Sequence, residues 1–166
     1  MKTTAFFTRM FSWLTGSRLT VDNSVVRELD LDRILGSWYE VARFDHFFER
    51  GMSQTKANYV LRDDGNINVI NTGIKDGRPK TAKGKAKLTD IPSLLRVSFF
   101  GPFYSDYRVL LVDADYRYLL IGSGSDGYLW ILSRTPQLDD NDRAAILSEA
   151  KNRGYDTDKL IWVKQN

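Results

Sequence analysis

The chain has 166 residues, of which 42% are hydrophobic and 27% are charged, so it is long enough for one globular domain and too short for two comfortable ones. Its net charge of +3 is too small by itself to indicate nucleic-acid binding. The sequence contains no cysteine, which excludes disulfides, thiolate catalysis and cysteine metal sites.

Residues 1–16 predict an amphipathic helix, with aromatic and aliphatic side chains on one face and polar side chains on the other. Arg9 interrupts the apolar core that a cleavable signal peptide needs, and the segment is too short to span a bilayer. Two functional interpretations remain, a poor export signal and an amphipathic helix that lies on a membrane surface. The alternative without such a function is a helix that covers part of the domain, or a frayed terminus. We divide the chain into an amphipathic segment with a linker, 1–28, and a domain, 29–166.

A short helical turn and a strand open the domain. Residues 30–35 predict the turn, with Asp30 as its N-cap. Gly36 then lets the backbone swing into a strand of aromatic and β-branched residues that includes Trp38. Arg134 ends another strand much later in the chain, and a guanidinium stacked on an indole contributes about 0.5–2 kcal/mol. We therefore expect Arg134 to lie on Trp38.

Short strands with turn signals between them fill the middle of the chain. The patterns predict strands over 57–61, 66–71, 82–88, 94–100, 107–113, 117–123 and 127–133, with turns at 63–66 and 101–106. Within the second of these strands, Asn71 interrupts the apolar face. A polar group that faces inward needs a partner, and a ligand or water can supply it.

Three lysines share one face of the strand predicted over 82–88. Lys83, Lys85 and Lys87 face away from the small residues of the same strand. This lysine row either attracts anionic headgroups such as lipopolysaccharide, or is a solvated face that discourages edge pairing. We favour the second interpretation.

A helix and a last strand complete the pattern. Asp139 or Asp140 caps the helix, and Gly154 ends it. Its apolar stripe consists of Ile146, Leu147 and Ala150. Residues 159–163 predict a short strand beside the first one.

The chain resembles the lipocalin family in four stretches, which are WYEVARFDHFFERG, LRDDGNINVIN, VSFFGPFYSDY and YLWILSRTP. Gly36 and Trp38 match the first family motif, and Asp113 with Tyr116 matches the second. Arg134 matches the third. The stretches are similar above all to bacterial outer-membrane lipocalins and, more distantly, to apolipoprotein D, over about 29–163. The resemblance implies an all-β fold, an eight-stranded antiparallel up-and-down barrel (a calycin) with one C-terminal α-helix packed outside.

A barrel of eight strands can hold one small ligand when small residues face inward. The small residues expected there are Ala42, Ala57, Gly84 and Ala86. The expected wall consists of Val69, Val97, Phe99, Tyr59, Asn71 and Trp130, and the last three match positions that contact ligand in apolipoprotein D-like members. We expect a single-chain lipid, a fatty acid or a lysophospholipid, to bind non-covalently with its headgroup toward the mouth.

Residues 45–52 match the loop that forms a lid over the barrel mouth in lipocalins. We expect Phe47, Phe48 and Tyr104 to form a rim around the mouth. Arg50 would pair there with a carboxylate or phosphate of the ligand. The alternative is a surface loop whose two phenylalanines pack on the rim.

Two residues bear on catalysis and metal binding. Glu40 shares the parity of Trp38 and is expected to be buried, which raises the pKa of a carboxyl group, although a carboxylate beside an arginine is more often a structural pair. His46, the only histidine, is expected to be a solvated loop residue, because a single histidine without cysteine is a poor metal or haem site.

We therefore expect a binding protein without a cofactor or metal, and no nucleic-acid partner. The prostaglandin-directed enzymes of the family use a cysteine, which this sequence lacks, and a nucleophile elbow and phosphate loop are also absent. The alternatives are an isomerase that acts on a lipophilic substrate, and a barrel that serves as a scaffold for protein interactions.

The resemblance favours a protein of the cell envelope or membrane surface that is linked to membrane lipid maintenance, with a cytoplasmic location left open. Bacterial outer-membrane lipocalins are typically anchored through a lipidated cysteine, and this sequence has none. Residues 1–16 would contact the membrane instead.

Overall fold

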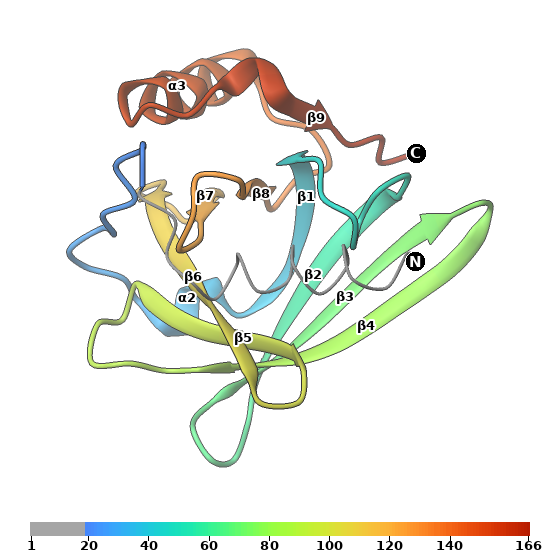
Figure 1. Ribbon diagram of the computed structural model, residues 1–166, viewed down its shortest axis with the longest axis vertical. Helices are drawn as coiled ribbons and strands as arrows, with labels where there is room; N and C mark the ends of the chain where they lie inside the picture. The colour runs from blue at the N-terminus through green and yellow to red at the C-terminus, as the bar shows by residue number, and fades with distance from the viewer. Residues whose placement is uncertain (1–18) are drawn as a thin grey trace, which may run out of the picture.

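Eight antiparallel strands close into a barrel, and a helix near the C-terminus lies across its outside (Figure 1). The computed structural model describes residues 19–166, so the amphipathic segment predicted over 1–16 lies outside the described residues. The strands follow chain order around the barrel, and β1 pairs with both β8 and β2, which closes the sheet. This architecture confirms the predicted fold class.

Most connections between the strands are short turns. The barrel strands are β1 Gly36–Phe44, β2 Ser53–Leu61, β3 Ile67–Lys75, β4 Arg78–Lys87, β5 Leu94–Phe100, β6 Phe103–Val112, β7 Tyr118–Gly122 and β8 Leu129–Ser133. The other elements are α2 Leu31–Ile34, α3 Asp140–Asn152, η1 Thr157–Lys159 and β9 Leu160–Trp162, which pairs with β1 as predicted. Within 19–166, the structure holds no helix long and apolar enough for a membrane span.

Three strands begin four residues before their predicted start. β2 begins at Ser53, β4 at Arg78 and β6 at Phe103. Backbone pairing with the neighbouring strand continues through these mostly polar stretches, which the alternation of side chains does not reveal. The turn predicted over 101–106 is correspondingly short, because Phe100 already pairs with Phe103.

β1 contains a bulge that reverses the facing of its side chains. Its pairing with β8 shifts between Glu40 and Ala42. An extra residue in one strand changes which face the following residues occupy. Ala42 therefore joins the core beneath α3 and does not line the barrel interior, so that prediction was wrong. Glu40 and Arg43 instead meet, with a hydrogen bond of 3.0 Å from Nη1 to Oε1.

The barrel wall separates two hydrophobic clusters. One lies inside the barrel and includes Trp38. The other lies between the wall and α3, where Ile146 and Ala150 are buried and Leu147 is partly buried. Asp139 caps α3 by accepting a hydrogen bond from the backbone of its first turn. These contacts confirm the predicted helix and its apolar stripe.

Arg134 and Trp38 meet at the closed end of the barrel. The guanidinium carbon of Arg134 lies 3.6 Å from the centre of the indole, as predicted. Its nitrogens donate to the carbonyl oxygens of Arg33, Leu35 and Ser37 at 2.8–2.9 Å. The indole Nε1 of Trp38 donates to the carbonyl of Ile34 at 2.8 Å. One arginine thus joins the end of β8 to α2 and the start of β1.

The second family motif ties the β6–β7 turn to α2. Asp113 accepts hydrogen bonds from the backbone and the side chain of Arg117. The hydroxyl of Tyr116 accepts from the backbone of Asp30, and the guanidinium of Arg33 lies 4.2 Å from the centre of its ring. Asp30 caps α2, as predicted. The predicted structural residues are therefore grouped at one end of the molecule.

Candidate ligand-binding cavity

A cavity of about 480 Å³ occupies the barrel interior. It extends from Ile34, near the closed end, to the β1–β2 loop and the β3–β4 and β5–β6 hairpins. Small-molecule sites typically have volumes of about 300–1,000 Å³. The barrel interior is therefore hollow enough to be a binding site.

Most residues predicted to contact a ligand line this cavity. They are Tyr59, Val69, Asn71, Ala86, Val97, Phe99, Trp130, Phe48 and Tyr104. Phe47 does not line it and packs on Phe48, with ring centroids 4.0 Å apart. Arg50 is exposed and bonded to Asp45 at 3.0 Å, so the structure does not place it beside a headgroup in the cavity.

Small side chains open the wall, as the sequence suggests. Ala57 and Ala86 line the cavity. Gly84 makes room for Phe99, because a Cβ atom at this glycine would lie 2.8 Å from the phenyl ring. None of the lysine row of β4 lines the cavity: the ammonium of Lys85 lies 3.7 Å from Asp64, and that of Lys87 lies 4.2 Å from the centre of the Tyr104 ring.

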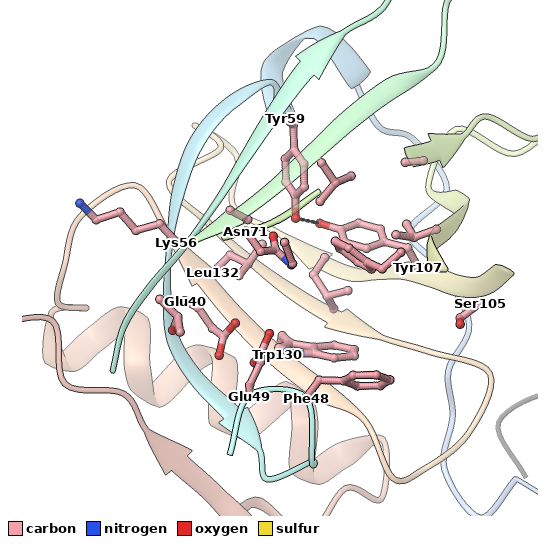
Figure 2. Close-up of a pocket in the computed structure, with 18 of the residues that line it drawn as sticks. Glu40, Phe48, Glu49, Lys56, Tyr59, Asn71, Ser105, Tyr107, Trp130 and Leu132 are labelled. Carbon is pink, nitrogen blue, oxygen red and sulfur yellow. Dashed lines mark hydrogen bonds between the residues drawn. The ribbon is translucent and has the colours of Figure 1, made fainter. Parts of the chain in front are cut away.

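A pair of tyrosines forms a polar point inside the apolar wall. The hydroxyls of Tyr59 and Tyr107 are 2.9 Å apart, and their rings meet edge to face (Figure 2). Burial raises the pKa of both phenols, so both stay protonated over the physiological range. Tyr107 was not predicted as a site residue, although its spacing from Val109 on β6 indicates an inward position.

A buried polar cluster, formed by Glu40, Arg43, His46 and Glu49, lies where β1 meets the β1–β2 loop. Besides Glu40, Arg43 bonds the backbone carbonyls of Glu49 at 2.8 Å and Met52 at 3.2 Å. Its Nε lies 3.6 Å from Oε2 of Glu49. Glu40, His46 and Glu49 line the cavity. This cluster therefore gives one wall of the cavity a strongly polar character.

The two carboxyl groups of the polar cluster titrate in opposite directions. Burial, together with the charge of Glu49, raises the pKa of Glu40 well above its ordinary value. Burial opposes ionisation of Glu49 too, but hydrogen bonding to His46 and Glu40 and the positive charges of His46 and Arg43 together outweigh it and hold the pKa of Glu49 below its ordinary value. Glu40 therefore tends to be neutral while Glu49 is charged. The expected burial of Glu40 and its direction of titration are confirmed.

His46 is buried rather than solvated, so that prediction was wrong. Its ring lies 5.6 Å from Trp130, 5.7 Å from Tyr128 and 5.8 Å from Phe48, measured between centroids. The β1–β2 loop folds onto β8 and encloses the imidazole, which no local pattern in the sequence reveals. Glu49 was missed for the same reason. Among the described residues, no group of three or more side chains is arranged to hold a metal ion.

Comparisons with known proteins agree with this geometry. A family model described as a lipocalin-like domain matches residues 29–165. The outer membrane lipoprotein Blc of Citrobacter freundii is 51% identical over 86% of this chain and 82% of its own length. Apolipoprotein D of Mus musculus is 30% identical over 85% of this chain and 79% of its own. Insecticyanin from the tobacco hornworm Manduca sexta has a similar fold, with a TM-score of 0.72 and 21% identity, over 90% of this chain and 86% of that one.

Proposed function

Because this chain belongs to the lipocalin family, whose members bind small hydrophobic ligands, we propose that it binds one single-chain lipid non-covalently inside its barrel. The proposed ligand is a fatty acid or a lysophospholipid, and the proposed role is its transport or storage in membrane lipid maintenance. The observation that carries this proposal is the hollow barrel, with about 480 Å³ enclosed mainly by apolar side chains.

The cavity wall favours an acyl chain because most of it is apolar, although its lining includes the tyrosine pair, the polar cluster and three lysines, Lys56, Lys75 and Lys80. Trp130, Phe99 and Val97 present apolar surface between them. Burial of each methylene contributes about 0.8 kcal/mol, so ten of them contribute about 8 kcal/mol before the cost of ordering the chain. The affinity should therefore rise with chain length until the cavity is full.

We also propose that residues 1–16 bring the protein to a membrane surface, where such lipids are found. The support is their amphipathic pattern, and these residues lie outside the described part of the chain. This proposal agrees with a location at the cell envelope or a membrane.

A chain-length series tests the ligand proposal. Fatty acids of increasing length are titrated calorimetrically into the wild type and into Ala86→Trp, which fills the cavity from β4. Ala145→Trp, on the exposed side of α3, is the matched control. We expect affinity to rise with chain length in the wild type and the control, and to fall by about tenfold or more in the filled barrel.

Affinity that is flat across chain lengths, or unchanged in a folded Ala86→Trp protein, would remove the ligand proposal and leave the scaffold alternative. Extraction and mass spectrometry of the purified protein give an independent answer. A co-purified fatty acid or lysophospholipid supports the proposal. Turnover of a lipophilic substrate would favour the isomerase alternative instead.

A further inference from the structure

The polar cluster contains two carboxyl groups and only one permanently charged cation. Two carboxyl groups, those of Glu40 and Glu49, lie close together beside a single guanidinium, that of Arg43. Arg43 is 2% exposed, and its Nη atoms donate hydrogen bonds to Glu40 and to two backbone carbonyls. Buried carboxylates need cationic partners. One guanidinium can balance only one ionised carboxylate, so Glu40 keeps its proton as long as no further cation is present.

Several polar atoms of the polar cluster have no hydrogen-bond partner within 19–166. They are Nε of Arg43, both ring nitrogens of His46, and Oε2 of Glu49. The side chain of His46 is only 8% exposed, and it lines the cavity. Its Nε2 lies 3.3 Å from Oε2 of Glu49, but neither atom makes a well-directed hydrogen bond. Nε of Arg43 is a donor and lies 3.6 Å from Oε2 of Glu49. Oε2 of Glu49 is an acceptor without a well-directed hydrogen bond, and a cationic ligand group at the cavity wall can satisfy such an acceptor.

Aromatic rings surround the same place. The rings of Tyr128 and Trp130 are stacked with centroids 5.8 Å apart, and both line the cavity with Phe48. His46 connects Glu49 to these rings, because its Nε2 lies 3.3 Å from Oε2 of Glu49 and its ring lies 5.6 Å from that of Trp130 and 5.8 Å from that of Phe48, measured between centroids. Aromatic faces next to a carboxylate attract ammonium groups through cation–π and Coulomb interactions, and they attract carboxylates far less.

We propose that the polar cluster and its aromatic neighbours bind the ammonium group of a cationic or zwitterionic single-chain amphiphile. The ammonium group supplies the second cation that allows Glu40 and Glu49 to be ionised together, while the acyl chain fills the barrel. This inference rests on the proposed function and specifies the headgroup. An anionic headgroup would meet the lysines at the rim, Lys56, Lys75 and Lys80, and would gain nothing from the polar cluster.

The test uses amphiphiles with the same twelve-carbon chain. Dodecyltrimethylammonium, dodecylammonium and dodecanoate are titrated below their micelle concentrations into the full-length protein. We expect the two ammonium compounds to bind about tenfold more tightly than dodecanoate. Comparison of the two cations distinguishes hydrogen bonding from charge and cation–π attraction, because only dodecylammonium can donate hydrogen bonds to Glu49 and His46.

Glu49→Gln should reduce the ammonium preference to about threefold or less. Glu28→Gln, at an exposed position of the linker, is the matched control and should keep the full preference. Glu40→Gln is the second variant, since it resembles the neutral carboxyl group and should fold in any case. It should weaken ammonium binding as well and leave dodecanoate binding unchanged.

The outcomes separate this inference from the proposed function. Binding of all three compounds with no headgroup preference, or a preference that survives in both variants, would overturn the ammonium site and leave the lipid cavity standing. Tighter binding of dodecanoate would favour the lysines at the rim instead. Absence of binding for every compound would overturn both proposals.

Discussion

Two arginines, Arg134 at the closed end and Arg43 in the cavity wall, have similar roles in the chain but different surroundings. Each guanidinium donates hydrogen bonds to backbone carbonyls, and these bonds hold a loop or a helix against β1. Arg134 stacks on Trp38, and this pair brings no buried carboxylate with it. Arg43 is fully enclosed beside two carboxyl groups, and its Nε remains without a hydrogen bond.

The surroundings of these two arginines distinguish polar groups that stabilise the fold from polar groups that are available to a ligand. At the closed end, the nitrogens of Arg134 and Trp38 are bonded to carbonyls within the chain. In the polar cluster, several side-chain atoms of residues at the cavity wall have ion-pair partners but no hydrogen bond among residues 19–166. Saturated networks stabilise a structure, whereas unsaturated buried groups cost stability unless something binds them. Substitutions at the two ends should therefore have different effects.

The largest loss of stability is expected from Arg134→Ala. The substitution removes the stack on Trp38 and leaves the carbonyls of Arg33, Leu35 and Ser37 without their donor. We expect a loss of about 1–3 kcal/mol in the free energy of unfolding, measured by urea denaturation. Arg27→Ala, at an exposed position of the linker, is the control. A variant that unfolds like the wild type but no longer binds lipid would contradict the structural role.

A smaller loss is expected from Asp113→Asn in the β6–β7 turn. Burial opposes ionisation of Asp113, but hydrogen bonds from Arg117 and its backbone outweigh it and hold the pKa below the ordinary value of 3.8. A lowered pKa in the folded state stabilises the protein above the ordinary value, and this contribution disappears as the pH falls through the folded value. Because Arg117 is half exposed, we expect a loss of about 1 kcal/mol at pH 7.

The measurement for Asp113 is the pH dependence of thermal unfolding. The difference between Asp113→Asn and the wild type should shrink below pH 3.8. Asp115→Asn, on the exposed side of the same turn, should show little difference at any pH. A difference that stays constant down to the acid limit would show that the charge of Asp113 is not the cause.

Glu40→Gln should increase stability instead of lowering it, because it removes an ionisable group that the folded state keeps neutral. The raised pKa means that the folded state holds a proton which the unfolded state has lost above the ordinary value of 4.5. Wild-type stability therefore falls as the pH rises from 4.5 through the raised value, and glutamine removes that fall. We expect a melting temperature about 2–4 °C higher than wild type at pH 8, equivalent to about 1 kcal/mol.

At pH 4 the two proteins should melt together, because Glu40 is then mostly protonated in both the folded and the unfolded wild type. Melting curves recorded at several pH values without ligand make this comparison. A Glu40→Gln protein that is less stable than wild type at pH 8 would show that the ion pair with Arg43 outweighs the cost of burying the Glu40 charge. The polar groups of the cluster would then be paired within the chain, like those of the closed end.

The smallest effect on stability is expected from removal of residues 1–16, which should leave the melting temperature unchanged. Their amphipathic pattern predicts membrane binding instead of folding. Flotation with liposomes should recover the full-length protein and not the truncated one. Equal flotation of the two would remove the membrane proposal.

The closed end could be predicted from sequence because its residues belong to motifs on rigid elements. Gly36 and Trp38 open the first barrel strand, and Arg134 follows the last one. The closure of the barrel brings these two strands together, and the three residues meet in the structure. The inward positions of β3, β4 and β5 followed from simple alternation. Most of the predicted cavity wall is found for this reason.

The polar cluster could not be predicted in the same way. The bulge in β1 changes the facing of Ala42 and Arg43, and a period of two residues cannot reveal it. The burial of His46 depends on contacts between the β1–β2 loop and β8, which are distant in the chain. Arg50 was assigned to the mouth by its place in the loop that resembles the lipocalin lid and by its charge, but Asp45 binds it outside the cavity.

Parallel measurement of stability and ammonium affinity in Arg134→Ala and Glu49→Gln tests the central distinction most directly. Arg134→Ala should lower the melting temperature by about 2–12 °C and leave the dissociation constant for dodecyltrimethylammonium within about twofold of wild type. Glu49→Gln should weaken that binding by about threefold or more with little change in melting temperature. If each variant loses stability and affinity together, the closed end and the polar cluster do not have the separate roles assigned to them.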